Sequence, residues 1–129
     1  MRIIWMLVLL FLVPYGYAEP IQCGGATFDV EYAPRNAAPG GWEQVKLTIA
    51  KNKKQIQKRY ENVYFHIDCL KNPTNKPYIV WQAYCGGSSC RDLDNWGIVD
   101  PASLKIMIEP SDDNHEKAEK IFGGSLKQF

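Results

Sequence analysis

The sequence predicts an α+β domain in which a mostly antiparallel sheet of five or six strands carries one C-terminal helix and two disulfides. Three observations lead to this prediction. Apolar residues alternate with polar ones along most of the chain, a pattern typical of strands with one face on a core. A helical apolar stripe occurs only near the C-terminus. Four cysteines follow an N-terminal segment typical of exported proteins.

The first eighteen residues have the organisation of a secretory signal peptide. Arg2 precedes an apolar run, Ile3 to Val13, and Ala18 ends a small-residue cleavage site. This run is shorter than the roughly 20 residues that a membrane-spanning helix needs. We therefore expect residues 1–18 to be removed and residues 19–129 to form a single periplasmic or secreted domain.

Cleavage after Ala18 would also make the chain neutral. Arg2 is the only charged residue of the signal segment, so 14 of the 15 basic residues remain against 14 acidic ones. A neutral chain lacks the positive field that supplies most nonspecific nucleic-acid affinity. Cys23 lies beyond the cleavage position, whereas a lipid-anchoring cysteine would lie directly at it. We expect no nucleic-acid partner and no stable membrane anchor.

The alternating segments predict the strands in chain order. Their apolar residues are Phe28, Val30 and Tyr32; Val45, Leu47 and Ile49; Val63, Phe65, Ile67 and Cys69; and finally Leu104, Ile106 and Ile108. Residues 78–85 are apolar on both faces, which indicates a central strand. Residues 97–99 and 104–108 flank Asp100-Pro101, a favourable turn sequence, and so predict a hairpin.

Residues 50–60 allow two interpretations. Asn52 can open a hairpin turn, followed by a short edge strand with Ile56 and Tyr60, whose lysines discourage pairing with another edge. The alternative is one or two helical turns. We favour the edge strand.

The helix is expected near the C-terminus. Asp113 is the predicted N-cap, and Glu116 lies three positions further on, as in a capping box. Gly123 provides a stop signal. The apolar stripe that should pack on the sheet consists of Ala118, Ile121 and Phe122.

The four cysteines are expected to form two disulfides, because an exported chain meets an oxidising compartment. Four cysteines allow three pairings. Only the flexible segment Gly86-Gly87-Ser88-Ser89 separates Cys85 from Cys90, so this pair can close a short bridge. We therefore predict the bonds Cys85–Cys90 and Cys23–Cys69. The spacing lacks the paired C-x2-C of zinc sites, so no metal site is predicted.

The sequence contains no convincing catalytic constellation. His66 lies on the outward face of a predicted strand, and His115 lies in the first helical turn, where the helix dipole disfavours an imidazolium. We expect surface or packing roles for both. Asp92, Asp94 and Asp100 form a run typical of a solvated loop edge. We predict a protein that is not an enzyme and has no cofactor.

The most informative segment is 84–97. A short disulfide loop at the tip of a strand has little conformational entropy left to lose on binding. Tyrosine, arginine and tryptophan are the residue types enriched in interface hot spots. The expected binding residues are Tyr84, Gly86, Gly87, Ser88, Ser89, Arg91, Asp92 and Trp96. The hypothesis is a protein-binding module of the inhibitor or immunity type, with an enzyme or toxin as partner.

A structural interpretation of the same segment stays open. In it, Trp96 fills the core, Arg91 pairs with Asp92 or Asp94, and the loop only ends a strand. A second functional hypothesis is a glycan- or small-molecule-binding envelope protein with Trp42, Trp81 and Trp96 as stacking surfaces.

One short region resembles a known family. The C-x4-C loop at a strand end, followed by a strand and an Asp-Pro turn, is similar to the inhibitory loop region of the periplasmic inhibitors of vertebrate-type lysozyme. The similarity covers some twenty residues. The loop of that family carries a histidine that enters the lysozyme active site, whereas the loop here is Gly86-Gly87-Ser88-Ser89. The resemblance implies an inhibitor-like protein but assigns no functional residue.

Overall fold

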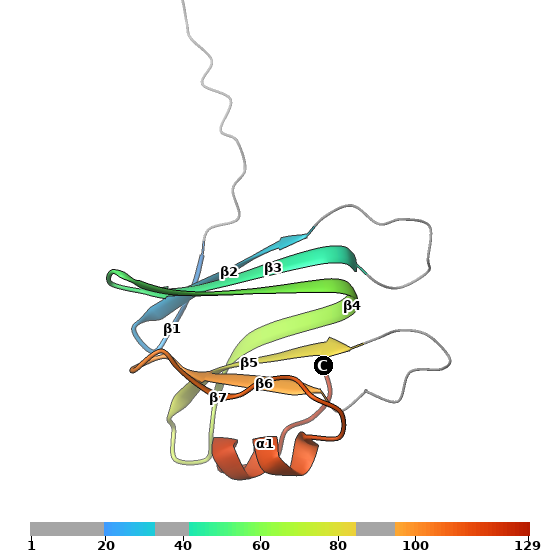
Figure 1. Ribbon diagram of the computed structural model, residues 1–129. Coiled ribbons are helices and arrows are strands. Elements are labelled where there is room, and N and C mark those ends of the chain that lie inside the picture. The colour runs from blue at the N-terminus through green and yellow to red at the C-terminus, as the bar shows by residue number, and fades with distance from the viewer. Residues whose placement is uncertain (1–19, 33–41, 85–94) are drawn as a thin grey trace, which may run out of the picture.

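The computed structural model describes residues 20–32, 42–84 and 95–129, except for the side chains of Trp42, Glu43 and Asn62. These residues form seven strands and one helix, and each strand pairs antiparallel with the next one in the chain (Figure 1). The elements are β1 (Ile21–Cys23), β2 (Ala26–Tyr32), β3 (Trp42–Lys51), β4 (Lys54–Lys71), β5 (Pro77–Tyr84), β6 (Trp96–Asp100), β7 (Lys105–Ile108) and α1 (His115–Phe122).

Strand β4 belongs to both halves of this sheet. Its first part pairs with β3, from Lys54 opposite Lys51 to Val63 opposite Trp42, and its second part pairs with β5. The chain therefore forms two four-stranded halves that share β4. Figure 1 shows β1–β3 as an upper layer, β5–β7 as a lower layer and α1 beneath the latter.

The expectation of five or six strands in one sheet is wrong, because seven strands form two four-stranded halves. Strand β1 was missed because it is too short to show an alternation, and residues 54–60 and 63–69 belong to one continuous strand that serves both halves. Ile56 and Tyr60 pack against the core in the first part of β4, but Val63 and Ile67 do so in the second part. The residues of β4 that face the core thus change from even-numbered to odd-numbered positions where β4 passes from one half to the other. The sequence pattern therefore resembles that of two separate strands.

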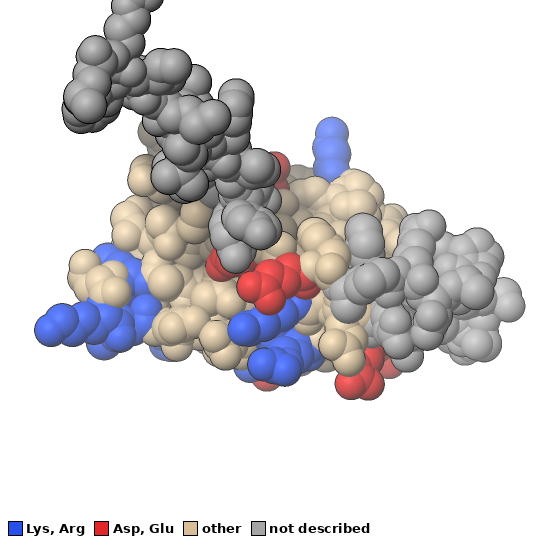
Figure 2. All heavy atoms as spheres, turned by 90° about the horizontal axis from the view of Figure 1, so that it is seen from above, with Lys and Arg blue, Asp and Glu red and all other residues tan. Residues whose placement is uncertain are grey.

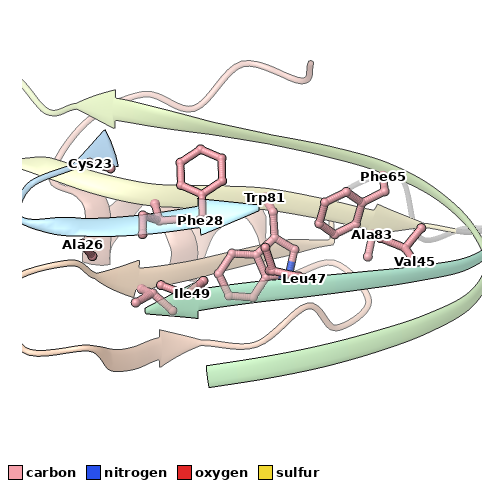
Figure 3. Close-up of a cluster of buried hydrophobic side chains, with 11 residues drawn as sticks. Cys23, Ala26, Phe28, Val45, Leu47, Ile49, Phe65, Trp81 and Ala83 are labelled. Atoms are coloured by element: carbon pink, nitrogen blue, oxygen red, sulfur yellow. The ribbon is translucent and has the colours of Figure 1, made fainter. Parts of the chain in front are cut away.

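The first core lies between the two halves, and its largest member is Trp81, which is fully buried (Figure 3). The indole Nε1–H of Trp81 donates a hydrogen bond of 3.0 Å to the hydroxyl of Tyr60, so a residue of β5 contacts the first part of β4. Gly97 lies opposite Trp81 on β6, and a Cβ there would be 2.1 Å from the indole Cε2. Only glycine leaves room for the ring at this position.

The second core lies between β5, β6 and α1. Its buried members are Tyr78, Val80, Trp96, Ile98, Ala118, Phe122 and Leu126. Positions Tyr78 to Ala83 of β5 are all buried because one face meets the first core and the other face meets the second. The prediction of a central strand here is confirmed.

The predicted disulfide Cys23–Cys69 is confirmed, and it joins β1 to the second part of β4. The other predicted pair, Cys85 and Cys90, lies outside the described residues, so one disulfide rather than two is described. A disulfide indicates folding in an oxidising, extracytoplasmic compartment. Within the described ranges, no helix is long and apolar enough to cross a membrane.

The local predictions for the turns are confirmed. Asn52 has a φ of 56° in the turn between β3 and β4, so residues 50–60 are the end of a hairpin and not helical. The Asp100-Pro101 sequence opens the turn between β6 and β7, and the side chain of Asp100 accepts the N–H of Ala102 at 3.0 Å.

The helix prediction is confirmed at one end only. Gly123 ends α1 with a φ of 81°, and Ala118 and Phe122 are buried. The N-cap, however, is Asn114 and not Asp113, and the side chain of Asn114 makes no capping hydrogen bond. Asn114 is turned away from its own helix because its carboxamide binds backbone groups of the sheet.

Removing the disulfide is expected to destabilise the fold strongly. The bond closes a loop with a sequence separation of 46. Loop-closure entropy then predicts that Cys23→Ala/Cys69→Ala lowers the free energy of unfolding by about 4 kcal/mol, measured by urea denaturation. A double variant as stable as the wild-type protein would show that the bond does not constrain the unfolded chain.

The hydroxyl of Tyr60 is expected to produce a pH dependence. Burial raises the pKa of Tyr60 above its ordinary value of 10.0, Glu109 raises it further, and the hydrogen bond from Trp81 acts in the opposite direction. The folded state therefore holds the phenolic proton more tightly than the unfolded state. This contribution to stability is complete below about pH 10 and is lost as the pH rises through the raised pKa.

Tyr60→Phe tests this expectation. At neutral pH, the variant should lose about 1–2 kcal/mol of unfolding free energy, because the buried indole N–H of Trp81 loses its acceptor. Above pH 10 its stability should fall less steeply than that of the wild-type protein. Denaturation curves measured between neutral and alkaline pH check both points, and parallel declines would contradict the second.

Candidate functional site

Four aromatic side chains form a partly exposed cluster at one end of the lower layer. We call Tyr64, His66, Tyr84 and Phe129 the aromatic patch. Tyr64 and Tyr84 stack with ring centroids 5.3 Å apart, and His66 lies 6.4 Å from Tyr84 and 6.1 Å from Phe129. His66 is exposed, Phe129 is 40% exposed, and both tyrosines are half-buried.

Strand register brings the patch together. Tyr64 pairs with Tyr84, and His66 pairs with Gln82. The side chains of these four strand residues therefore point to the same face of the sheet. This face carries Val80 and Tyr78 further along β5, where α1 covers them. The helix has eight residues, and the buried side chains with which it forms the second core do not include those of the patch.

The segment after α1 holds Phe129 in the patch. The backbone N–H of Leu126 donates to a carboxylate oxygen of Glu119 at 2.9 Å, and the C=O of Leu126 lies 2.7 Å from Nε2 of His115. The backbone N–H of Phe129 donates to Oε1 of the buried Gln82 at 3.2 Å. These bonds lay the segment across the end of the sheet.

His115 has a packing role. Its ring stacks on Trp96 with centroids 5.6 Å apart, besides its contact with the backbone of Leu126. Its Nε2 also lies 3.6 Å from Oε1 of Glu119 on the same helix, and the stacking on Trp96 gives it the packing role that the sequence led us to expect.

Tyr84 is expected to remain neutral at neutral pH. Burial raises the pKa of Tyr84, and the neighbouring Tyr64 raises it further. A protonated phenol can both donate and accept a hydrogen bond. At neutral pH, Tyr84 therefore offers an apolar ring together with a hydroxyl group.

The patch lies beside the two ends of segment 85–94. Strand β5 ends at Tyr84, and the described chain resumes at Asn95. The carboxamide of Asn95 donates to the C=O of Ala83 at 3.1 Å, which joins the two ends. Asn95 is itself buried.

Asn114 fixes the returning end of this segment. Its Oδ1 accepts the N–H of Trp96 at 2.7 Å, and its Nδ2 donates to the C=O of Trp96 at 2.8 Å and of Glu109 at 3.0 Å. Its side chain is buried, so water does not compete for these bonds. The residues that flank segment 85–94, Ala83 before it and Asn95 and Trp96 after it, are therefore held by hydrogen bonds of buried side chains; we call them the base of the segment.

The structure separates the predicted binding residues. Tyr84 belongs to the aromatic patch. Trp96 is fully buried, stacked on His115 and 5.8 Å from Phe129, so it is a core residue and not an exposed contact residue, as the structural interpretation had it for this one position. The remaining predicted residues lie outside the described ones, namely Cys85, Gly86, Gly87, Ser88, Ser89, Cys90, Arg91 and Asp92.

The prediction of three exposed tryptophans for glycan binding is also wrong for two of the three. Trp81 and Trp96 are both fully buried. Each is large and apolar and lies on a strand that is covered on both faces, which explains their burial. The side chain of Trp42 lies outside the described part of the structure.

Sequence reasoning did not single out Tyr64, Phe129 or Asn114. The alternation that places Val63 and Phe65 inward does place Tyr64 and His66 outward, so this signal was present. Their position beside Tyr84 depends on the register of β4 with β5, and that of Phe129 depends on the fold of the chain after α1.

Variants of Asn114 test how the base of the segment is held. At an exposed N-cap, aspartate and asparagine are almost equivalent. Here Asn114→Asp would lose both donor hydrogen bonds and place a carboxylate beside two carbonyl oxygens. We expect Asn114→Asp and Asn114→Ala each to lower the unfolding free energy by about 2–4 kcal/mol, measured by chemical denaturation.

Asp113→Asn is the control for these variants. It alters the exposed neighbouring residue and should change stability by no more than about 0.5 kcal/mol. If Asn114→Asp were as stable as the wild-type protein, the side chain would act as an ordinary helix cap instead.

Comparisons of the chain with protein-family models, with curated proteins and with solved structures found no match.

Proposed function

We propose that this protein is a small exported protein-binding module of the inhibitor or immunity type. Its contact surface consists of the aromatic patch together with segment 85–94, and its partner is another protein, such as an enzyme or toxin. The observation that carries this proposal is the position of the partly exposed patch beside the hydrogen-bonded base of that segment.

The chemistry of the patch suits a protein interface. Tyrosine supplies a large, amphipathic contact area with few rotatable bonds and is enriched at interface hot spots. The rings of Tyr64 and Tyr84 are stacked on each other, so little side-chain freedom remains to be lost on binding. A partner that covers these rings would gain apolar contact at a low entropic cost.

The base of segment 85–94 also favours binding of a protein partner. Asn95 and Asn114 fix its two ends through buried hydrogen bonds, so the positions from which the segment starts and returns are set before binding. Closure by the proposed Cys85–Cys90 disulfide would restrict the segment further. Preorganisation of this kind increases affinity.

Export is part of the proposal. Residues 1–18 act as a signal peptide cleaved after Ala18, and residues 19–129 form a periplasmic or secreted domain without catalytic activity. The disulfide Cys23–Cys69 supports an extracytoplasmic location.

A paired set of variants tests the binding surface. Tyr84→Ala removes a patch residue, Gly87→Arg enlarges segment 85–94, and Tyr32→Ala is the matched control because Tyr32 is an exposed tyrosine on β2. In co-purification from the native envelope, the wild-type protein and Tyr32→Ala should retain the same partner. Tyr84→Ala should bind it at least about thirtyfold more weakly, as expected for a hot spot.

Gly87→Arg should also release the partner. If Tyr84→Ala and Gly87→Arg both retained it as well as the control, contact through this surface would be excluded. If the wild-type protein retained no partner, the inhibitor or immunity function would be wrong. Circular dichroism and unfolding curves of each variant separate lost binding from lost folding.

The second candidate function is binding of a glycan. The surface for it would be the half-buried, stacked tyrosines of the patch, because Trp81 and Trp96 are buried. A sugar ring stacked on the patch would lie close to Trp96, which is 5.8 Å from Phe129. Titration with cell-wall fragments should then change the tryptophan fluorescence of the wild-type protein, and less so that of Tyr84→Ala. A flat titration would count against this candidate.

A further inference from the structure

Basic side chains gather at the end of the molecule opposite the aromatic patch. From Gln44 to Tyr60 the chain has six basic residues and no acidic one. Three of the six, Lys51, Lys53 and Lys54, lie at the tip of the β3–β4 hairpin. Figure 2 shows basic side chains at the left end of the molecule, where this hairpin ends in Figure 1.

The hairpin turn holds like charges together. Lys51 and Lys54 are direct cross-strand partners, and Lys53 lies in the turn between them. Like charges in directly opposite positions destabilise a pair of strands. No ion pair reaches these three lysines within the residues that the structure describes, whereas Lys58 on the same hairpin pairs with Glu109. Like charges held together without an opposite charge nearby are a local cost, and such costs are a mark of a functional surface.

The lysines border a hollow. Residues of the β3–β4 turn and of the β6–β7 turn border an open hollow of about 600 Å³, and its lining is Lys51, Asn52, Lys53, Lys54, Ala102, Ser103 and Leu104. The ammonium group of Lys51 donates to the C=O of Ala102, which joins the two turns. The lining contains three cations and no anion.

The hollow also offers a neutral donor. The Oγ of Ser103 accepts the N–H of Lys105 at 3.3 Å, so the hydroxyl hydrogen of Ser103 can be donated to an anion. Lysine binds phosphate as a mobile point charge, without the bidentate geometry that arginine imposes. A set of lysines with a hydroxyl therefore suits clustered phosphate groups better than a single planar carboxylate.

We propose that this lysine-lined hollow binds phosphate groups displayed on an anionic surface such as a lipid headgroup layer. The inference is independent of the proposed protein partner, because the β3–β4 turn that lines the hollow and the end of β5 that carries Tyr84 lie at opposite ends of the molecule (Figure 1). One end would attach reversibly to an anionic surface while the other end remains accessible to a protein. Contact is electrostatic and weakens as salt screens it.

A charge-matched pair of variants tests this proposal. Lys53→Gln/Lys54→Gln removes two cations from the hollow, and Lys117→Gln/Lys120→Gln removes two exposed cations from α1. The first assay is co-sedimentation with phosphatidylcholine vesicles with and without phosphatidylglycerol. Both variants share the same N-terminal segment, so any insertion of that segment into lipid affects them equally.

The wild-type protein should bind only the vesicles that contain phosphatidylglycerol, and added salt should weaken that binding. One lysine near an anionic membrane contributes about fivefold in affinity. Lys53→Gln/Lys54→Gln should therefore bind about 25-fold more weakly, and Lys117→Gln/Lys120→Gln should bind within about twofold of the wild-type protein.

The second assay is calorimetric titration with tripolyphosphate, which separates two sources of phosphate. Binding to vesicles without binding to tripolyphosphate assigns the site to a headgroup layer, and binding to both shows that free clustered phosphates suffice. The proposal is overturned if neither probe binds, if both variant pairs weaken binding equally, or if Lys53→Gln/Lys54→Gln has no effect.

Discussion

Burial of β5 on both faces is the constraint from which the rest of the architecture follows. A strand with Ile79 and Trp81 on one face and Tyr78 and Val80 on the other must be covered twice. The first half of the sheet covers one face and α1 covers the other. An eight-residue helix would be marginal by itself, and its stability derives from this packing.

The same constraint explains where binding surfaces are available. The large apolar side chains, including those of Trp81 and Trp96, are buried in the two cores on either side of β5, so they are not available to contact a partner. Where β5 ends, the segment after α1 instead of the helix lies over the sheet face, and its Phe129 joins the partly exposed aromatic patch there. At the other end the β3–β4 hairpin reaches the β6–β7 turn, and its side chains there are charged. The two candidate surfaces are thus consequences of how far the covering elements extend.

Much of the local structure could be predicted because it depends on neighbours in the chain. The alternations around Leu47 and Phe65, the turn at Asn52 and the end of the helix at Gly123 are all local signals, and the structure confirms them. The pairing of Cys23 with Cys69 was also predicted, because the short spacing of the other two cysteines left these two as partners. The even-to-odd change within β4 could not be predicted, because a strand whose inward positions shift by one residue has the same pattern as two separate strands.

By itself, the sequence determined the strand period around Leu47 and Phe65, the C-terminal helix, the central position of β5 and the pairing of Cys23 with Cys69. These features depend on periodicity, turn residues and cysteine spacing. Only the tertiary structure decided which residues meet across strands and which side of each remains exposed. The side chain of Asn114 binds the backbone of Trp96 instead of capping the helix, and Trp96 itself is a core residue. Tyr64 lies beside Tyr84 across the β4–β5 pair. The physical reason is that strand register and helix length, which set these contacts, arise from interactions between residues far apart in the chain.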